Sequence, residues 1–399
     1  MSTGTNFHNS FDEVFLRAIA LGTPPAAPMA LKPCASTQPA PLVVPPDLNW
    51  SGIDGNWSTF PILLGSSQQA FSILISTTND ITFVPNLFND SLSNGGDFGL
   101  DTVGLQLQDS VLSTDQQIIG SVATRDFYLG LLGLGTTYTN FSTYNQPLPS
   151  LVWTLKNQSR IPSLSYGYTA GASYRYPGSL TLGGYDKSRF EPSNVDFTFP
   201  VDTAQNLTVG IQSITTNNTL NRGGLTEDIT SFTSGTPGHL SLIDSKVPHI
   251  WLPRDVCDRI EQAFRLTYNP RSDLYVVNNT IHTQLVQLNP ALTFRLGSDV
   301  SGGNSTTIVL PYSAFDLVLA AGFPYSNATH YFPIRRAANA SQHTIGRAFL
   351  QEAYLVVDYE RSTFSVNQAA MPSPLPQHQI IAIPPPVPSP NPAASPPVR

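Results

Sequence analysis

Two segments of the chain, each fifteen residues long, follow the same pattern. The first is FSILISTTNDITFVP at residues 71–85, and the second is HLSLIDSKVPHIWLP at residues 239–253. In each segment an apolar run ends at a polar residue, Ser76 or Asp244, and an aromatic residue and then a proline follow. The two polar residues lie 168 positions apart, about half of the central body of the chain. We therefore predict that the chain contains two copies of one β-rich lobe.

A shorter signature follows each copy of the repeat. Leu131–Gly133 follows the first copy and Thr344–Gly346 follows the second, and each is typical of a short strand that ends in glycine. From the polar residue to this glycine the first copy spans 57 residues and the second spans 102 residues. The first copy is therefore 45 residues shorter between its two signatures.

Proline content divides the chain into a body and two flanking segments. Eight prolines gather near the start of the chain and eleven near its end. We expect residues 1–45 to be a poorly ordered leader and residues 369–399 to be a disordered tail. The body is expected to form an N-terminal lobe at residues 46–200 and a C-terminal lobe at residues 201–368.

The body is rich in short β-branched and aromatic runs that are separated by Gly, Pro, Asn and Ser. This pattern is typical of an all-β protein with many short strands. Few segments have helical periodicity. The best is residues 254–267, and a second short helix is expected at residues 311–319.

The charge of the chain excludes several partners. Charged residues make up only 12% of the 399 residues, and the net charge is −7. A chain with so few basic residues is not suited to nucleic acid or to an anionic membrane surface. No apolar run approaches the roughly 20 residues that a membrane-spanning helix needs.

Asn-x-Ser/Thr sequons predict the compartment. Eleven of them are spread over the body, so we expect a glycosylated protein that is secreted or displayed at the cell surface. The N-terminus shows no evident signal peptide, because its apolar part is short and contains Arg17. The sequence leaves two alternatives for the cysteines: Cys34 and Cys257 form a disulfide, or Cys257 is a buried thiol. The sequons begin at Asn49, Asn56, Asn89, Asn140, Asn157, Asn206, Asn217, Asn278, Asn304, Asn327 and Asn339.

Residues 46–368 resemble the pepsin family of aspartic proteases, in particular its secreted fungal members. The two fifteen-residue segments resemble the family's active-site turns. YLGLLGLG at residues 128–135 and HTIGRAFLQEAYLVVDYERSTFSV at residues 343–366 resemble the strands that follow these turns, and GSLTLGGYD at residues 178–186 resembles the approach to the sheet between the lobes. The resemblance implies a bilobal pepsin-like fold with a cleft between two related lobes.

The family's chemistry needs two Asp-Thr/Ser-Gly turns, whose two carboxylates share one proton. A serine hydroxyl cannot be half of such a pair, so Ser76 leaves Asp244 as the one retained catalytic Asp. Lys246 either folds toward Asp244 and holds it as a carboxylate or, as we expect, points into solvent. The corresponding turn residues are Ser76, Thr77 and Thr78 in the first copy and Asp244, Ser245 and Lys246 in the second.

The resemblance also implies a flap hairpin, with a tyrosine, over the cleft of the first lobe. Only about eleven residues separate Pro85 from Asp97, and residues 97–105 resemble the strand that comes after the flap. We therefore expect the flap region to be shortened. Asp80, Asp97 and Asp101 are the nearby acids that could replace the lost carboxylate, but Asp80 is expected to be a surface residue.

The leading prediction is a secreted pseudo-protease that binds a peptide, a protein or a cell-wall polymer in its cleft. We expect a monomer, and the sequence contains no motif for a cofactor or a metal ion. His239 and His249 flank the second turn and either line the cleft or are structural. Two alternatives stay open. One is an active acid endopeptidase that relies on Asp244, and the other is a faulty gene model of an active enzyme.

Overall fold

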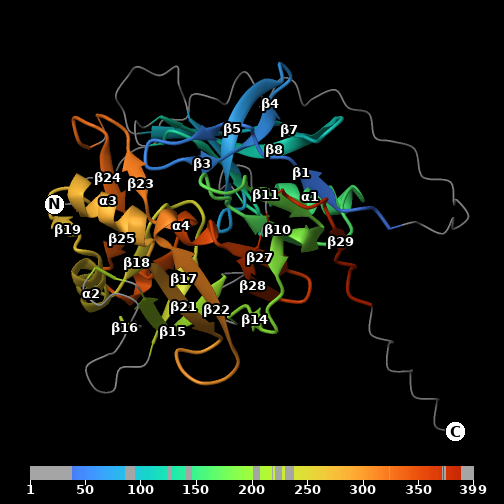
Figure 1. The fold of residues 1–399 in the computed structure, drawn as a ribbon. Helices are drawn as coiled ribbons and strands as arrows, with labels where there is room; N and C mark the ends of the chain where they lie inside the picture. The colour runs from blue at the N-terminus through green and yellow to red at the C-terminus, as the bar shows by residue number, and fades with distance from the viewer. Residues whose placement is uncertain are drawn as a thin grey trace, which may run out of the picture. The chain divides into compact units, whose positions relative to one another are not determined.

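The structure is a computed structural model, shown in Figure 1, in which strands predominate. It describes residues 38–85, 95–123, 127–140, 146–200, 207–217, 219–220, 227–229, 238–322, 324–370, 372 and 374–387. The prolines and Cys34 of residues 1–37 lie outside this part, as do residues 86–94, where the shortened flap region was expected, and the sequons at Asn89 and Asn206. No helix in the described part of the chain combines the length and the apolar character that crossing a membrane requires.

The first lobe is built on a closed barrel in the strand order β4-β5-β9-β6-β8-β7. The second half of β5 is buried on both faces, which explains its continuous apolar run ILI before Ser76. Ile73 and Ile75 point into the main core, whereas Leu74 belongs to a separate apolar cluster. The barrel strands are β4 (Phe60–Leu64), β5 (Gln69–Ser76), β6 (Thr82–Pro85), β7 (Gly95–Gln106), β8 (Val111–Ala123) and β9 (Gly130–Gly133).

The second lobe contains an eight-stranded sheet and a smaller four-stranded sheet. The larger sheet comprises β15 (Thr208–Asn217), β16 (Glu227–Asp228), β17 (His239–Ile243), β18 (Ile250–Leu252), β21 (Ala291–Gly297), β22 (Ser305–Pro311), β25 (Ile334–Arg336) and β26 (Thr344–Ile345). The smaller sheet comprises β19 (Thr267–Asn269), β20 (Leu274–Val276), β23 (Leu317–Leu319) and β24 (Thr329–Phe332).

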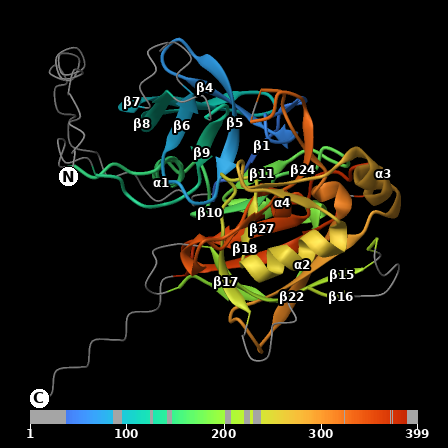
Figure 2. The ribbon, with the colours of Figure 1, turned by 90° about the vertical axis from the view of Figure 1, so that its left-hand side faces the viewer.

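A seven-stranded sheet joins the lobes, and Figures 1 and 2 both show its strands β10 and β27 between the barrel and the sheets of the second lobe. It comprises β1 (Leu42–Val44), β10 (Ser165–Thr169), β11 (Ser179–Leu182), β13 (Phe190–Glu191), β14 (Asp196–Thr198), β27 (Ala353–Asp358) and β28 (Thr363–Ala369). Two strand pairs complete the fold, β2 (Trp50–Ser51) with β3 (Trp57–Ser58) and β12 (Gly184–Asp186) with β29 (Ile380–Ala382).

The two lobes repeat the same strand crossing. In the first lobe β5 runs parallel to β9, and β6 crosses β9 in the antiparallel direction at Phe83 and Leu131. In the second lobe β17 runs parallel to β26, and β18 crosses β26 in the antiparallel direction at Trp251 and Thr344. The predicted internal duplication is therefore present in the strand pairing, and both apolar runs and both glycine signatures take part in it.

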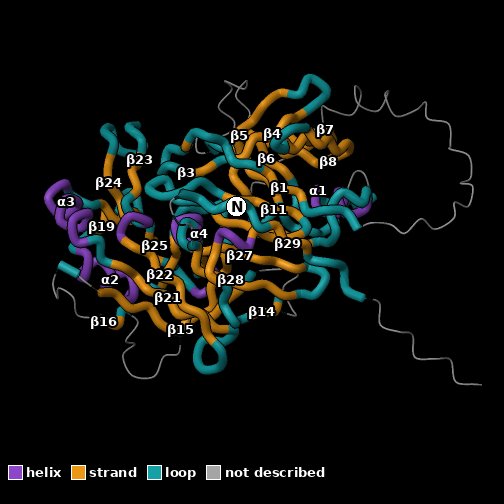
Figure 3. Tube along the Cα trace, turned by 45° about the vertical axis from the view of Figure 1, so that its right-hand side comes forward, coloured by secondary structure: helices purple, strands orange, loops and turns teal. Residues whose placement is uncertain are grey.

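Helices are few and short, and Figure 3 shows α2 and α3 beside the smaller sheet. The helix predicted at 254–267 is confirmed as α2. The helix predicted at 311–319 is wrong, because only a 3-10 turn forms there and the chain then enters β23 to pair with β24. The helices are α1 (Leu151–Asn157), α2 (Arg254–Phe264), α3 (Asn279–Leu288) and α4 (Arg347–Leu350), with 3-10 turns η1 (Lys187–Arg189), η2 (Tyr312–Ala314) and η3 (Ala340–Gln342).

Parts of the proline-rich flanks form strands, which the sequence did not predict. β1 lies in the expected leader and pairs with β11, while β29 lies in the expected tail and pairs with β12. The tail is also held by Asp186, whose carboxylate accepts a hydrogen bond from the backbone of Gln379. Short apolar runs such as LVV and IIA interrupt the prolines here, and an open sheet edge satisfies their backbone groups. Cys257 is a buried free thiol on α2.

Candidate active site

The two repeated turns meet through a symmetric set of buried hydrogen bonds. The backbone N–H of Thr77 donates to Ser245 Oγ at 3.0 Å, and the backbone N–H of Ser245 donates to Thr77 Oγ1 at 3.1 Å. The two hydroxyls then donate across the interface, Thr77 Oγ1 to the carbonyl of Ile243 at 3.1 Å and Ser245 Oγ to the carbonyl of Ile75 at 2.6 Å. Each turn therefore satisfies the polar groups of the other, and neither can move alone.

Ser76 and Asp244 occupy equivalent positions immediately before these two residues. Ser76 is fully buried at the end of β5, and its Oγ accepts a hydrogen bond from the backbone N–H of Asn79 at 3.2 Å. Asp244 is only 5% exposed, and its Oδ1 accepts from Thr78 Oγ1 at 3.0 Å and from the backbone N–H of Lys246 at 3.1 Å. The second turn thus holds a carboxylate where the first holds a hydroxyl.

Lys246 folds toward Asp244, so the expectation that it points into solvent is wrong. Its Nζ lies 3.3 Å from Asp244 Oδ2. A nearly buried carboxylate without a counter-charge is costly, which explains why the lysine head turns inward while 41% of its side chain stays exposed. All the described contacts of the Asp244 carboxylate are therefore with Thr78 and Lys246, and none is with a second acid.

Asp80 makes its described hydrogen bond within the first lobe and not with Asp244. Its Oδ1 accepts a hydrogen bond from the backbone N–H of Thr137 at 2.8 Å, and a Cβ on Gly135 would come within 2.2 Å of the same oxygen. Asp80 is half-buried rather than at the surface as expected. Burial raises the pKa of Asp80 more than the hydrogen bonds from Thr137 lower it. Asp97 and Asp101 lie on β7 and are exposed.

A cavity of about 650 Å³ opens beside the second turn. This volume is typical of a small-molecule or peptide side-chain site. Its walls are largely apolar and come from both halves of the chain. Lys246, Arg335 and Arg347 also line it, and each forms an ion pair, with Asp244, Asp273 and Asp54 respectively. The apolar wall includes Leu74, Leu129 and Leu131 from the first half and Val247, Leu274 and Leu319 from the second.

Arg347 is a site residue that the sequence analysis missed. It is 3% exposed, and its Nη1 donates to the carbonyls of Ser245 and Lys246 at 3.0 and 2.6 Å. Its guanidinium lies 4.6 Å from the centre of the Trp57 ring, and its Nη2 lies 3.6 Å from Asp54 Oδ2. Arg347 therefore holds the second turn against the first lobe. The only sequence signal was its place directly after the signature glycine.

The two histidines that flank the second turn have different surroundings. His249 lines the cavity and is half-buried, and its pKa is well below the ordinary value because of desolvation and then the charges of Arg335 and Arg347. Both effects disfavour a positive charge on His249. His239 does not line this cavity. It packs against His343 with the ring centres 4.6 Å apart, and neither of its ring nitrogens has a hydrogen-bond partner in the described structure.

His239 makes the protein less stable in acid. Burial, and secondarily the charge of His343, lowers the pKa of His239 from 6.5 to about 4. The unfolded chain binds the proton near pH 6.5 and the folded chain only near pH 4, so stability falls across this window by up to about 3 kcal/mol. In urea unfolding, His239→Leu should lose less stability than wild type between pH 7 and pH 4. The two proteins should behave alike between pH 7 and pH 8, and equal losses below pH 6.5 would contradict the prediction.

All described sequons are accessible. Nine of the eleven asparagines lie in the described part of the chain, and each of these nine is exposed. Asn278 and Asn339 also cap a helix and a 3-10 turn through their side-chain oxygens. The amide nitrogen that would carry a glycan stays free of the capping bond, because the cap uses the oxygen.

The joined turns, the duplicated strand crossing and the shared sheet define a bilobal, pepsin-like β protein. The chain belongs to the eukaryotic aspartyl protease family, whose family model matches residues 76–369. The crystal structure of the aspartic proteinase from Irpex lacteus has a TM-score of 0.58 and 16% identity to this chain, and the match covers 83% of this chain and 98% of that one. The predicted fold and the resemblance on which it rested are confirmed.

Secreted aspartic proteases of Candida albicans are among the relatives of this chain. Candidapepsin-1 is 24% identical over 283 residues, which cover 70% of this chain and 63% of the relative. Secreted aspartic protease 5 is 22% identical over 322 residues, which cover 79% of this chain and 66% of the relative. Candidapepsin-4 is 28% identical over 145 residues, which cover 36% and 33%. The matches therefore span between one third and two thirds of the length of these relatives.

Proposed function

We propose that the protein is a non-cleaving member of the family that binds peptide or protein segments between its lobes. The observation that carries this proposal is the ion pair between Lys246 and Asp244, opposite a turn in which Ser76 stands where the family has its other aspartate. A lysine ammonium neutralises the carboxylate where a shared proton would otherwise do so.

The chemistry of the family depends on two carboxylates that act on one water. One carboxylate removes a proton from the water, and the protonated one donates to the scissile carbonyl. Ser76 has no proton to exchange in the acid range, and its Oγ is engaged by the N–H of Asn79. Removing one member of such a unit costs several orders of magnitude in rate, so Asp244 alone should not support turnover.

The cavity beside the second turn supports peptide binding. Its apolar walls suit the side chains of a peptide. Of its three cationic side chains, Arg335 has the longest ion pair, 3.8 Å from Nε to Asp273 Oδ2, and its Nε makes no hydrogen bond, so we expect Arg335 to bind a carboxylate. A cell-wall polymer is a weaker candidate, since a neutral sugar chain would leave both features unused. We expect the bound segment to combine apolar side chains with an acidic group.

Secretion is part of the same proposal. The nine described sequon asparagines are exposed, and the names of the Candida relatives describe secreted proteases. We propose a glycosylated protein that is secreted or held at the cell surface, and we expect it to act as a monomer.

The first test measures cleavage of a denatured, fluorescently labelled protein from pH 2.5 to 6, with wild type and Asp244→Asn side by side. We expect no cleavage by either protein. Cleavage by wild type that is lost in Asp244→Asn would overturn the proposal and would establish an active acid endopeptidase.

A binding measurement accompanies the cleavage test. Labelled apolar peptides that differ only in a free or an amidated C-terminus are titrated with wild type, with circular dichroism as the check of folding. The free carboxylate should bind about ten-fold more tightly, equivalent to about 1.4 kcal/mol. Arg335→Gln should reduce this preference. No binding of either peptide to folded protein would contradict the peptide-binding part of the proposal.

A further inference from the structure

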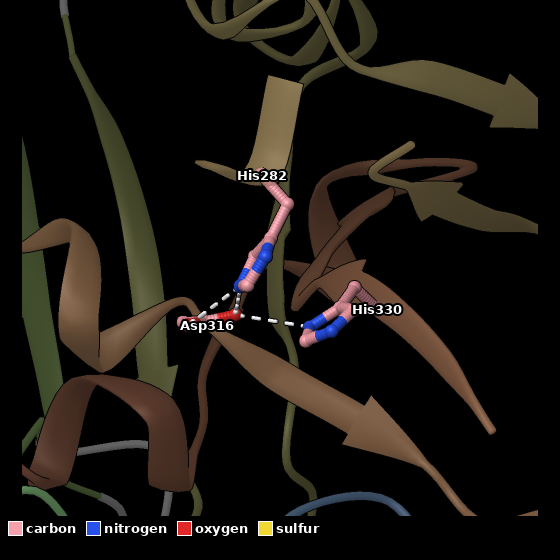
Figure 4. Close-up of side chains that lie close together, drawn as sticks. All are labelled: His282, Asp316 and His330. Carbon is pink, nitrogen blue, oxygen red and sulfur yellow. Dashed lines mark hydrogen bonds and ion pairs between the residues drawn. The ribbon is translucent and has the colours of Figure 1, made fainter. Parts of the chain in front are cut away.

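Two histidines and an aspartate form a cluster in the second lobe, away from the repeated turns. His282 comes from α3, Asp316 from the segment between η2 and β23, and His330 from β24. Figure 4 shows the Asp316 carboxylate against both imidazoles. His282 Nε2 lies 2.9 and 3.0 Å from the two carboxylate oxygens, and His330 Nδ1 lies 3.2 Å from Oδ1.

The spacing of these atoms is close to that of a zinc site. Zinc binds imidazole nitrogen and carboxylate oxygen at about 2.0–2.2 Å in tetrahedral geometry, which places neighbouring ligand atoms about 3.3 Å apart. The two nitrogen–oxygen separations of 2.9 and 3.2 Å approach this value. One ligand atom from each residue can be chosen so that all three lie within 4.8 Å of one another. Small side-chain movements would therefore suffice to surround an ion.

The cluster is accessible to an ion. The side chains of His282, Asp316 and His330 are 21%, 25% and 31% exposed. The imidazole rings stack with their centres 3.7 Å apart and their planes at 26°. Binding one ion requires the rings to turn apart about their side-chain bonds, and their partial exposure leaves room for this.

A buried hydroxyl next to the cluster has no partner in the described structure. Tyr312 is 1% exposed, its ring centre lies 6.5 Å from that of His282, and its hydroxyl makes no hydrogen bond. Such a hydroxyl is suited to form a hydrogen bond with a residue that ligates a metal ion.

We propose that His282, Asp316 and His330 bind one divalent transition-metal ion, with zinc as the best fit and water as the fourth ligand. Two imidazoles and a carboxylate favour zinc over the harder magnesium and calcium ions. The ion would fasten α3 to the smaller sheet and is separate from the chemistry of the repeated turns. Asp316 lies 34 residues after His282 and 14 residues before His330, so the three ligands form no short sequence motif. The sequence analysis accordingly predicted no metal site.

The test is a zinc titration of chelator-treated, full-length protein by isothermal calorimetry. Wild type should bind one zinc ion with a dissociation constant on the order of 1 µM. His330→Gln and Asp316→Asn should each weaken binding at least about 100-fold, since even outer-shell changes cost 10- to 100-fold. Cobalt(II) bound to wild type should give the visible absorption bands of four-coordinate nitrogen and oxygen ligation.

A matched control uses the other close histidine pair. His343→Gln removes one member of the pair formed with His239, whose rings also touch, and among the described residues no carboxylate is recorded in contact with this pair. This variant should bind zinc as wild type does. The proposal is wrong if wild type binds no zinc below 1 mM, or if His343→Gln loses as much affinity as His330→Gln. If Asp316→Asn fails to fold by circular dichroism, the zinc affinity of His330→Gln, a change at a side chain that is 31% exposed, decides between the outcomes.

Discussion

Replacing Gly133 with alanine should destabilise the protein by about 3 kcal/mol. A Cβ at this position would lie 2.5 Å from the carbonyl oxygen of Asn79 and 2.7 Å from that of Ile81. Both atoms belong to the backbone of the turn after β5, so neither can move without disturbing the pairing of β9 with β5 and β6. Urea unfolding of the purified variant measures the effect as a shift in midpoint at constant slope.

The duplicated fold supplies a second variant and a control. Gly346→Ala should cost as much, because its Cβ would lie 2.3 Å from the carbonyl oxygen of His249 at the equivalent place in the second lobe. Gly99→Ala is the matched control, since a Cβ there meets nothing within 4 Å, and it should stay within about 0.5 kcal/mol of wild type. If all three variants unfold at the same midpoint, close backbone approach is not why these positions are glycine.

Removing the hydroxyl of Thr77 should cost about 3 kcal/mol. Thr77→Val keeps the shape of the side chain but leaves the carbonyl of Ile243 and the backbone N–H of Ser245 without their partner. Each buried polar group left unpaired costs about 1–3 kcal/mol. Because these bonds join the two turns, the loss should appear in the same unfolding transition for both lobes, as measured by circular dichroism and tryptophan fluorescence.

Two further substitutions separate this effect from a general cost of losing a threonine. Thr77→Ser keeps the hydroxyl and should recover most of the stability. Thr283→Val, in the exposed part of α3, loses one hydrogen bond to the carbonyl of Asn279 and should change stability by less than about 0.5 kcal/mol. A Thr77→Val variant as stable as Thr283→Val would show that the bonds between the turns contribute little.

Much of the fold could be predicted from the repeat because strand periodicity and glycine positions are local signals. The apolar run before Ser76 and the one before Asp244 both became strands that end at one of the two joined turns. Helix α3 was missed, although Asn278 provides an N-cap bond to the backbone of Ile281, because the helix buries only Leu285 and shows little apolar periodicity. The position of α3 therefore depends on its packing against the rest of the lobe rather than on a periodic pattern of apolar residues.

The candidate site was predicted in part. The sequence placed Ser76 and Asp244 at equivalent positions, and the structure joins their turns through Thr77 and Ser245. The direction of Lys246 was predicted wrongly, because a side chain several bonds long can follow several paths and the burial of Asp244 decides among them. Arg347 was missed because the carbonyls that it holds belong to a turn about 100 residues earlier in the chain.

The sequence by itself determined the duplication, the β character of both lobes and the equivalent positions of Ser76 and Asp244, since each of these is a matter of residue identity at fixed spacing. Only the tertiary structure decided which charge faces Asp244, which residue donates a hydrogen bond to Asp80, and which side chains enclose the cavity. It also brought His282, Asp316 and His330 together. The physical reason is that electrostatic and packing contacts depend on distance in space, and a chain that folds back on itself makes that distance independent of separation in sequence.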